Sequence, residues 1–354
     1  MVACEGLYPD REVQIWYDLE TVYGTGAGAM AELGKVTSFN SNLSDEVQRL
    51  HGLGEGRNET SVSLGNVNVT ANIEWQPLAN FASARSPSVD FMKFAVGGII
   101  GAGSTADPYD IVESENYGYT EASDIPTFQL EIAKEGIGVV AGTPTDDTVR
   151  FIGCIMPSLT VSAAVGGLLT ARSDIRGQSI SCDASDVEVF TTETGNPMTY
   201  QQGSWAFNAT PTTVNHVQNF SITTANNPLI YRSLGSRLIA TPITGQRKWD
   251  WNTTMMMSSA QASGMRNDFL KDAATPFVFD TGISDAAITA DMEILGKFSE
   301  GATTNDLNVQ FLLDDAYIMS MSESVSVGGG LVQATFTGGA KSAKTNFVEY
   351  WKAT

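Results

Sequence analysis

An internal repeat constrains the fold of this chain more than any other feature of its sequence. Residues 36–57 read VTSFNSNLSDEVQRLHGLGEGR, and residues 217–237 read VQNFSITTANNPLIYRSLGSR. Both segments begin with V-x-x-F and end with Leu-Gly shortly before an arginine, and the valine and leucine lie 17 positions apart in each (36 to 53 and 217 to 234). Because the copies share no catalytic or metal-binding residue, the repeat indicates a duplicated structural unit.

Three further matches follow in the same order along the chain. Gly65 corresponds to Gly245, DFMK at 90–93 to DFLK at 268–271, and VGGLLTARSDIRG at 165–177 to VGGGLVQATFTGG at 327–339. Each copy is therefore predicted to contain a V-x-x-F strand, a loop ending at Leu-Gly and Arg, two paired strands, a short helix and a hairpin closed through Gly-Gly. The seam is expected within 181–207, where Thr, Asn, Gly and Pro accumulate.

Strand signals dominate the rest of the pattern. Apolar and polar residues alternate over five segments, and the breakers Gly, Pro, Asn or Asp lie at their ends: 60–75, 126–136, 157–175, 247–256 and 329–339. Helical candidates are short and follow Ser88 and Ser263. The sequence predicts a mainly β chain with a first domain at 36–190 and a second at 191–354. Residues 1–35 have no counterpart in the second half and are expected to form an arm or lead-in.

The charge balance argues against a surface that binds phosphate groups. Forty acidic and 20 basic residues give a formal net charge of −20, and the acids are spread along the whole chain of 354 residues. Binding to a nucleic-acid backbone needs clustered Lys and Arg. Two explanations of the acid excess remain open: solubility in a high-salt cell, where salt screens self-repulsion, or a surface past which nucleic acid must slide. The sequence contains no apolar run of about 18 residues, so membrane insertion is not predicted. No secretory signal is expected at the N-terminus.

Catalytic and cofactor motifs are missing from the sequence. Glycine-rich segments near Gly34 and Gly97 lack the spacing of nucleotide-binding loops, and no G-x-S-x-G elbow occurs. His51 and His216 have no short-range partners, so we expect no metal site and no cofactor. Cys154 is expected to be a small buried hydrophobic residue. The prediction is a protein that is not an enzyme.

Two acidic pairs and one aromatic segment are candidates for functional sites. Asp146-Asp147 and Asp314-Asp315 could serve glycoside hydrolysis, but adjacent acids at turns are expected by chance in so acidic a chain. The segment WDWNTTMMM at 249–257 could stack nucleic-acid bases, but core or subunit interface is favoured because three methionines follow the tryptophans.

Several segments together resemble the tail tube proteins of long-tailed, non-contractile phages and archaeal tailed viruses, in the branch whose chain holds two tube domains. The resemblance rests on IWYDLETVYGTGAG at 15–28, on the two repeat segments, on IEWQPL at 73–78, on RFIGCIMPSLTVSAAVGGLLTARSDIRGQ at 150–178 and on GQRKWDWNTT at 245–254. The first of these is similar to an E-x-x-Y-G-T-G lead-in of that family. Together the segments span nearly the whole chain.

The resemblance implies a fold of two tandem β-sandwich or half-barrel domains, each with a short flanking helix. It implies a virion protein, assembled in the host cytoplasm, whose stacked rings form a hollow tail tube that conducts double-stranded DNA. Two domains per chain imply a ring of three copies with pseudo-sixfold symmetry, a ring of six chains being the alternative, and other tail proteins at the tube ends. A negative channel wall would repel DNA phosphates, and the strong acidity suggests a halophilic host.

The resemblance and the repeat also assign residues to assembly. Phe39 and Phe220 are expected as equivalent core anchors, and the loops of Arg57 and Arg237 as equivalent contact points. Leu53 and Leu234 complete the equivalent set, and an arm that bridges rings is expected at Tyr23, Gly24, Thr25 and Gly26. Two other interpretations remain: a virion or extracellular β-sandwich adhesin, and a glycan-active enzyme on a β scaffold.

Overall fold

The fold is known from a computed structural model. It describes residues 13–20, 22–25, 30–50, 61–79, 87–96, 99–100, 109–111, 126–134, 147–183, 195–207, 212–213, 216–240, 242–243, 245–257, 294–300, 307–325 and 332–352.

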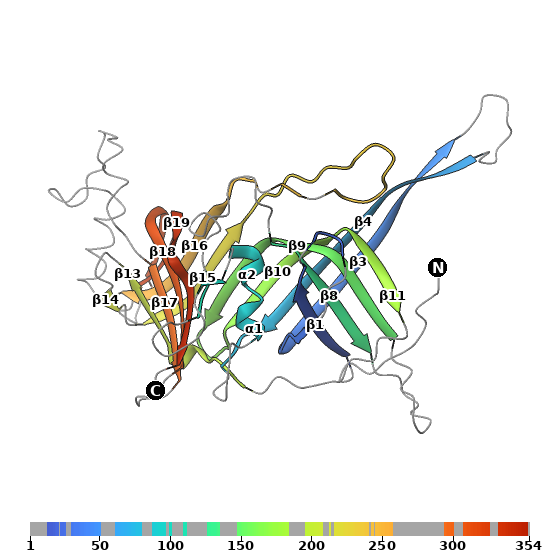
Figure 1. The fold of residues 1–354 in the computed structure, drawn as a ribbon. Helices are drawn as coiled ribbons and strands as arrows, with labels where there is room; N and C mark the ends of the chain where they lie inside the picture. The colour runs from blue at the N-terminus through green and yellow to red at the C-terminus, as the bar shows by residue number, and fades with distance from the viewer. Residues whose placement is uncertain are drawn as a thin grey trace, which may run out of the picture.

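Antiparallel β-strands make up most of the described chain (Figure 1). The strands are β1 (Val13–Leu19), β2 (Ala31–Glu32), β3 (Lys35–Leu50), β4 (Ser61–Gln76), β5 (Leu78–Ala79), β6 (Ile99–Ile100), β7 (Tyr109–Ile111), β8 (Phe128–Lys134), β9 (Asp147–Ala164), β10 (Thr170–Gly177), β11 (Ser179–Asp183), β12 (Asn196–Pro197), β13 (Gly203–Phe207), β14 (Thr212–Thr213), β15 (Val217–Ala225), β16 (Lys248–Met257), β17 (Ile294–Glu300), β18 (Leu307–Val325) and β19 (Val332–Lys352). Two short helices, α1 (Pro87–Asp90) and α2 (Lys93–Val96), lie where the first helix is predicted, and a 3-10 turn spans Tyr200–Gln202. The second predicted helix, after Ser263, lies outside the described residues. The mainly β prediction is confirmed.

The first half of the chain forms a bent sheet. Its first layer has the strand order β2-β1-β8-β9-β11, and its second has the order β3-β4-β10-β9. The long strand β9 belongs to both layers, because its first part pairs with β8 and β11 and its second part with β10. Gly153, at φ +65°, lies where β9 passes from one layer to the other. A left-handed backbone conformation is readily adopted only by glycine, so this residue permits the bend.

The second half repeats the same strand order. The strands β14-β13-β17-β18-β19 form one layer, and β15-β16-β19-β18 form the other. Registers agree as well: Phe39 pairs with Ile73 as Phe220 pairs with Thr253. The two units therefore share the order of eight strand segments, with β5, β6 and β7 inserted in the first unit and with β19 spanning the counterparts of both β10 and β11 in the second.

One continuous sheet joins the two units. The second part of β9 pairs antiparallel with β15 from Ser158↔Ala225 to Ala164↔Asn219. The boundaries predicted for the two domains, at 36–190 and 191–354, remain predictions. The hairpin through Gly-Gly is present between β9 and β10, where Gly166 has a φ of +75°.

The N-terminal strand differs from the prediction that residues 1–35 form an arm outside the core. In β1, the three consecutive side chains of Ile15, Trp16 and Tyr17 are buried. This strand pairs with β8 along its whole length and occupies the place in the first unit that β13 occupies in the second. The lead-in is thus part of the core at Ile15, Trp16 and Tyr17, because both faces of the strand are covered there.

The core of the first unit lies between the two layers and the helices. Tyr17, Trp75, Phe91, Phe94 and Phe128 form a chain of aromatic contacts with ring centroids 4.4–5.9 Å apart. Trp75 also donates from its indole N–H to the carbonyl of Ser88 at 2.8 Å, which fixes α1 against β4. Such contacts combine large apolar burial with a satisfied polar group. Cys154 is fully buried, as predicted.

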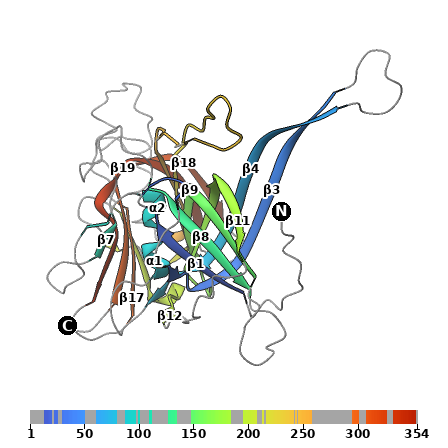
Figure 2. The same ribbon diagram turned by 45° about the vertical axis from the view of Figure 1, so that its right-hand side comes forward.

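The β3–β4 hairpin extends away from this body. Figure 1 and Figure 2 show both strands continuing well beyond the sheet. Side chains of β3 from Asn40 to Glu46 are exposed, which agrees with strands that leave the core. The connection between β15 and β16, drawn in yellow in Figure 1, runs out from the second unit on the side of the same hairpin.

Candidate assembly interface

A buried carboxylate holds the E-x-x-Y-G-T-G segment in place. Glu20 is 6% exposed and accepts hydrogen bonds from the backbone N–H of Gly24 at 3.1 Å and of Gly153 at 2.8 Å. Gln129 donates from its side chain to the carbonyl of Thr25 at 2.7 Å. The spacing of this motif is therefore explained within one chain: a carboxylate ties a turn to the bend of β9.

Neighbouring groups at this bend are shielded from water. The Tyr23 ring lies beside Gly153, where a Cβ would come within 3.0 Å of it. Burial raises the pKa of the Tyr23 phenol, and burial together with the nearby Glu20 carboxylate raises the pKa of the Cys154 thiol. Thr25 is exposed, and Gly26 lies outside the described residues. The role of Tyr23 to Gly26 between rings stays a prediction.

Phe39 and Phe220 occupy corresponding positions on β3 and β15. Phe220 is buried and stacks on Trp205 with ring centroids 4.6 Å apart. Phe39 is half-buried and packs on the core, with its ring 5.9 Å from that of Phe151. Phe39 is the less covered of the two, and it lies on a strand whose other edge has no partner among the described strands.

The Leu-Gly and Arg elements of the repeat lie in different settings. Leu53 and Arg57 fall outside the described residues. Leu234 is fully exposed at the tip of the β15–β16 connection, beside Gly235 at φ +86°. Arg237 contacts the β3–β4 hairpin of its own chain, so the structure brings it to residues that are distant in the sequence.

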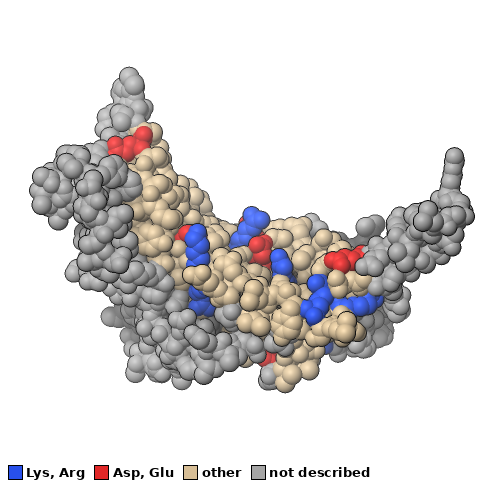
Figure 3. Space-filling model, turned by 90° about the horizontal axis from the view of Figure 1, so that it is seen from above, with Lys and Arg blue, Asp and Glu red and all other residues tan. Residues whose placement is uncertain are grey.

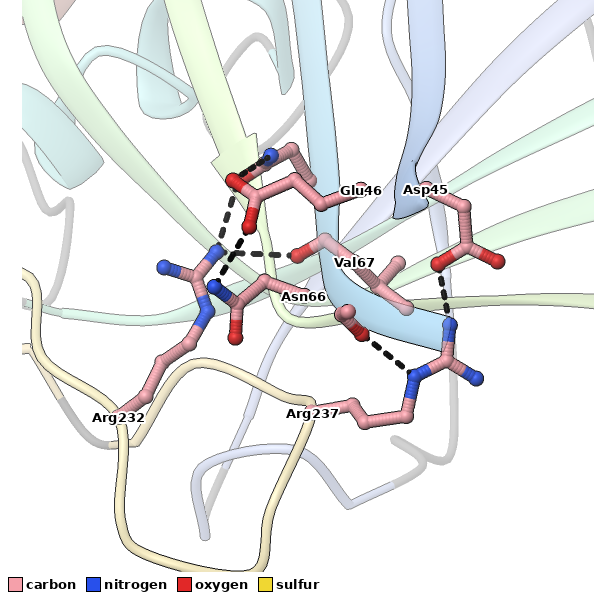
Figure 4. Close-up of polar contacts among 8 residues, drawn as sticks. Asp45, Glu46, Asn66, Val67, Arg232 and Arg237 are labelled. Atoms are coloured by element: carbon pink, nitrogen blue, oxygen red, sulfur yellow. Dashed lines mark hydrogen bonds and ion pairs between the residues drawn. The ribbon is translucent and has the colours of Figure 1, made fainter. Parts of the chain in front are cut away.

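Arg237 binds the β3–β4 hairpin through three contacts, and Figure 4 shows the two that its guanidinium makes. Its guanidinium donates to the carbonyl of Gly65 at 2.7 Å and pairs with the carboxylate of Asp45, and its carbonyl accepts from the backbone N–H of Val67 at 3.2 Å. Position 65 requires glycine because the β3–β4 pairing is irregular here: a Cβ on Gly65 would lie 2.5 Å from the carbonyl oxygen of Glu46.

Arg232 makes a second attachment on the same hairpin (Figure 4). It donates to the carbonyl of Val67 at 3.1 Å and to the side-chain oxygen of Asn68 at 2.6 Å. Hydrogen bonds from Asn66 and Asn68, with a smaller contribution from the charge of Arg232, lower the pKa of the Glu46 carboxyl. Sequence reasoning missed Arg232 and its partners, because they lie more than 160 positions apart.

The layer common to both units, called the shared layer below, has the strand order β3-β4-β10-β9-β15-β16-β19-β18, and both of its ends are unpaired edges among the described strands. Among the described residues, β3 pairs only with β4, and the second part of β18, from Ala316 to Val325, pairs only with β19. Exposed apolar side chains lie on both edges, at Leu43 (52% exposed) on β3 and Met319 (50%) on β18. Unpaired edges offer rows of free N–H and C=O groups to another chain.

The described residues offer little to a catalytic or metal-binding interpretation. They contain no group of three or more His, Cys, Asp or Glu side chains placed to hold a metal ion. No described helix has the length and apolar character needed to cross a membrane. Asp314 and Asp315 lie inside β18 and not at the turn expected for them. Trp249 and Trp251 are buried core residues, so they do not form a base-stacking platform.

A repeated, bent antiparallel sheet defines a β-rich protein whose described edge strands, β3 and the second part of β18, are free to pair with a further strand. The family model for phage tail tube proteins matches residues 10–340. The chain therefore belongs to the phage tail tube protein family, and its place is the tail of the virion. No curated protein matches the chain. Family membership makes its role a structural one in the tail tube.

Proposed function

We propose that three copies of this chain close into a ring, that rings stack into a hollow tube, and that viral double-stranded DNA passes through the channel. The observation that carries the proposal is the join between β9 and β15 inside one chain. It connects the edge of one unit to the edge of an equivalent unit, and so provides a template for the contact between chains.

The equivalent join between chains uses the two open edges. The counterpart of β15 is β3, and the counterpart of the second part of β9 is the second part of β18. In the proposed ring, β18 of one copy pairs antiparallel with β3 of the next copy. This closes every edge of the shared layer, which removes the aggregation risk of exposed strands.

The internal registers define which residues meet in this join. Phe39 corresponds to Phe220 at an offset of 181. The β16–β19 pairing places Ala334 and Phe336 as counterparts of Ala171 and Ser173, one position further along the chain than the equal-length match of 165–177 with 327–339 predicts. Through the β18–β19 register, Thr160 then corresponds to Ser322, and Thr223 to Asn42. Asn42 of one copy is therefore expected opposite Ser322 of the next.

The same register covers exposed apolar surface. It places Leu43, which is half exposed in one chain, opposite the partly buried Met321 of the next copy. Directly opposed side chains on a sheet contribute about 0.2–1 kcal/mol per pair, and burying apolar area contributes about 25 cal/mol per Å². With two units per chain, three copies place six equivalent units around the channel. This is the pseudo-sixfold arrangement that the resemblance to tail tube proteins implies.

Cysteine cross-linking tests both the register and the number of copies. Asn42→Cys and Ser322→Cys are introduced together in a chain whose Cys4 and Cys182 are replaced by serine; Cys154 stays, because it is buried. Oxidation of assembled tubes is expected to give a non-reducing gel ladder that ends at three chains. The matched control combines Asn42→Cys with Glu323→Cys, whose side chains point to opposite faces of the sheet. Its chains are expected to run singly on the non-reducing gel.

Two results would contradict the proposal. Tubes that form normally in electron micrographs but give no cross-link with the Asn42 and Ser322 pair would refute the strand join. A ladder that continues to six chains would refute the ring of three.

A further inference from the structure

The shared layer has one face in the core and one face in solvent. Along its strands, buried residues alternate with exposed or half-exposed ones, as in β10, where Arg172, Asp174 and Arg176 point to solvent between buried neighbours. Closing the shared layer into a ring turns one of its faces toward the channel. The solvent-facing side is assigned to the channel because the other side is covered by the core of the same chain. Figure 3 shows that Lys, Arg, Asp and Glu side chains are scattered over a largely uncharged described surface.

The strand registers arrange this face in rows that run across both units. One row contains only hydroxyl and amide side chains over six adjacent strands: Thr170, Ser162, Ser221, Asn252, Thr337 and Ser320. The adjacent row is also uncharged: Ala164, Asn219, Thr254, Thr335 and Ser322. An open groove of about 450 Å³ lies over part of both rows, lined by Ser162, Thr170, Asn219 and Ser221 among others.

Charged residues on this face lie outside the two uncharged rows, and acids and bases nearly balance. The described acids are Glu74, Asp174 and Asp250, and the described bases are Lys35, Arg172, Arg176 and Lys248, so the bases outnumber the acids by one. Lys248 pairs with Asp250 at 2.8 Å, and this contact raises the pKa of the lysine. The acid excess of the chain is therefore not placed on these described positions of the sheet.

Hydroxyl groups on the face bond to one another across strands. Thr160 and Thr223 join β9 to β15 with 3.0 Å between their oxygens, and Thr254 and Thr335 join β16 to β19 at 3.0 Å. A further hydroxyl pair, Ser320 with Thr337, joins β18 to β19. Side chains held in this way lie along the sheet and present neither a fixed charge nor a flexible cation to a passing polyanion.

We infer that the channel wall is a neutral, hydroxyl-lined surface that neither attracts nor repels the phosphates of double-stranded DNA. This inference rests on the proposed ring, which turns this face inward and continues the rows from β18 to β3 of the next copy. It replaces the expectation of a negative wall. A neutral wall acts alike at every salt concentration, whereas the field of a charged wall fades within about 8 Å at 0.15 M salt and about 3 Å at 1 M.

The electrical potential at the wall can be measured with a cysteine in the uncharged row. Ser221→Cys is introduced in the chain with Cys4→Ser and Cys182→Ser, and assembled tubes are treated with a cationic or an anionic methanethiosulfonate. The ratio of the two reaction rates is divided by the ratio for a free cysteine peptide. A potential of about one kT per unit charge would change this ratio about seven-fold. We expect a ratio within about two-fold of unity that does not change between 0.05 and about 1 M salt.

A matched variant calibrates the measurement. The variant combines Ser162→Asp with Thr170→Asp. Ser162 lies directly opposite position 221 in the sheet, and Thr170 lies opposite Ser162. The two substitutions add six carboxylates to a ring of three chains. This double replacement is expected to favour the cationic reagent several-fold at low salt and to lose that preference at high salt. If Ser221→Cys prevents assembly, Ser162→Cys in the same row gives the same measurement.

Three results would overturn the inference: a ten-fold preference for the cationic reagent, a ten-fold preference for the anionic reagent, or no reaction in tubes whose thiols react after denaturation. The first two would show a charged wall in an intact tube. The third would show that this face does not line the channel. Failure of the ring itself would be seen separately, in the cross-linking of Asn42 with Ser322.

Discussion

Replacing Glu20 by alanine is expected to destabilise the chain by about 3 kcal/mol. The Glu20 carboxylate accepts from the N–H groups of Gly24 and Gly153, at 3.1 and 2.8 Å, in a site that is 6% exposed. Hydrogen bonds to a charged group contribute about 1.5–3 kcal/mol each. Burying the carboxylate offsets part of this sum, but its loss leaves the buried N–H of Gly153 without an acceptor, at a cost of about 1–3 kcal/mol.

Urea titration followed by tryptophan fluorescence measures this change, because Trp16, Trp75 and Trp205 are buried and report unfolding. The protein is used at a concentration at which light scattering shows single chains. The matched control is Glu74→Ala, which removes the same charge from the solvent-facing side of β4 and is expected to change stability by no more than about 0.5 kcal/mol. If Glu20→Ala changed the free energy of unfolding as little as the control does, the carboxylate would not hold the bend of β9.

Four further predictions follow from the same structure. Gly153→Ala should destabilise by about 2–4 kcal/mol in urea titration, because its φ is +65° and a Cβ would lie 2.7 Å from that of Gln178; a stable variant would contradict the bend. Burial raises the pKa of Tyr23, so the folded state should lose stability as the pH rises above about 10, and Tyr23→Phe should reduce that loss; identical alkaline titrations would refute it. Arg237→Ala should speed amide hydrogen exchange in the β3–β4 hairpin by up to about ten-fold, since an exposed ion pair and one hydrogen bond contribute about 1–1.5 kcal/mol together; Arg237→Lys should have a smaller effect. Leu43→Lys should leave the chain folded by circular dichroism but prevent tube formation in electron micrographs, and normal tubes would argue against the β3 edge as an interface.

Local patterns predicted most of the individual elements. Alternation located β4, β8, β16 and the β9–β10 hairpin, and the Ser88 signal located the first helix. The strand β1 was missed as core because Ile15, Trp16 and Tyr17 are buried in succession, so the period of two that marks a half-buried strand is absent. Neighbours cover both faces of this strand, and no local pattern reports them.

The candidate interface could be predicted only in part from the sequence. The repeat identified Phe39 and Phe220 as equivalent, and the registers of the two hairpins agree with that pairing. The attachment of Arg237 to Asp45 spans 192 positions, and the sequence gives no sign of which hairpin the arginine reaches. Glu20 lies in the E-x-x-Y-G-T-G motif, but the sequence does not show that its carboxylate is buried against the N–H of Gly153, 133 positions away.

Residue order and composition alone predict the mainly β class, the duplication and the excess of acid. Pairing between distant strands sets the rest: one sheet joins both units, the edges of β3 and of the second part of β18 have no partner among the described strands, and described acids and bases nearly balance on the solvent-facing side of the shared layer. The physical reason is register: a shift of one residue turns every side chain to the other face of a sheet, and register is set by pairing between strands that are distant in the chain.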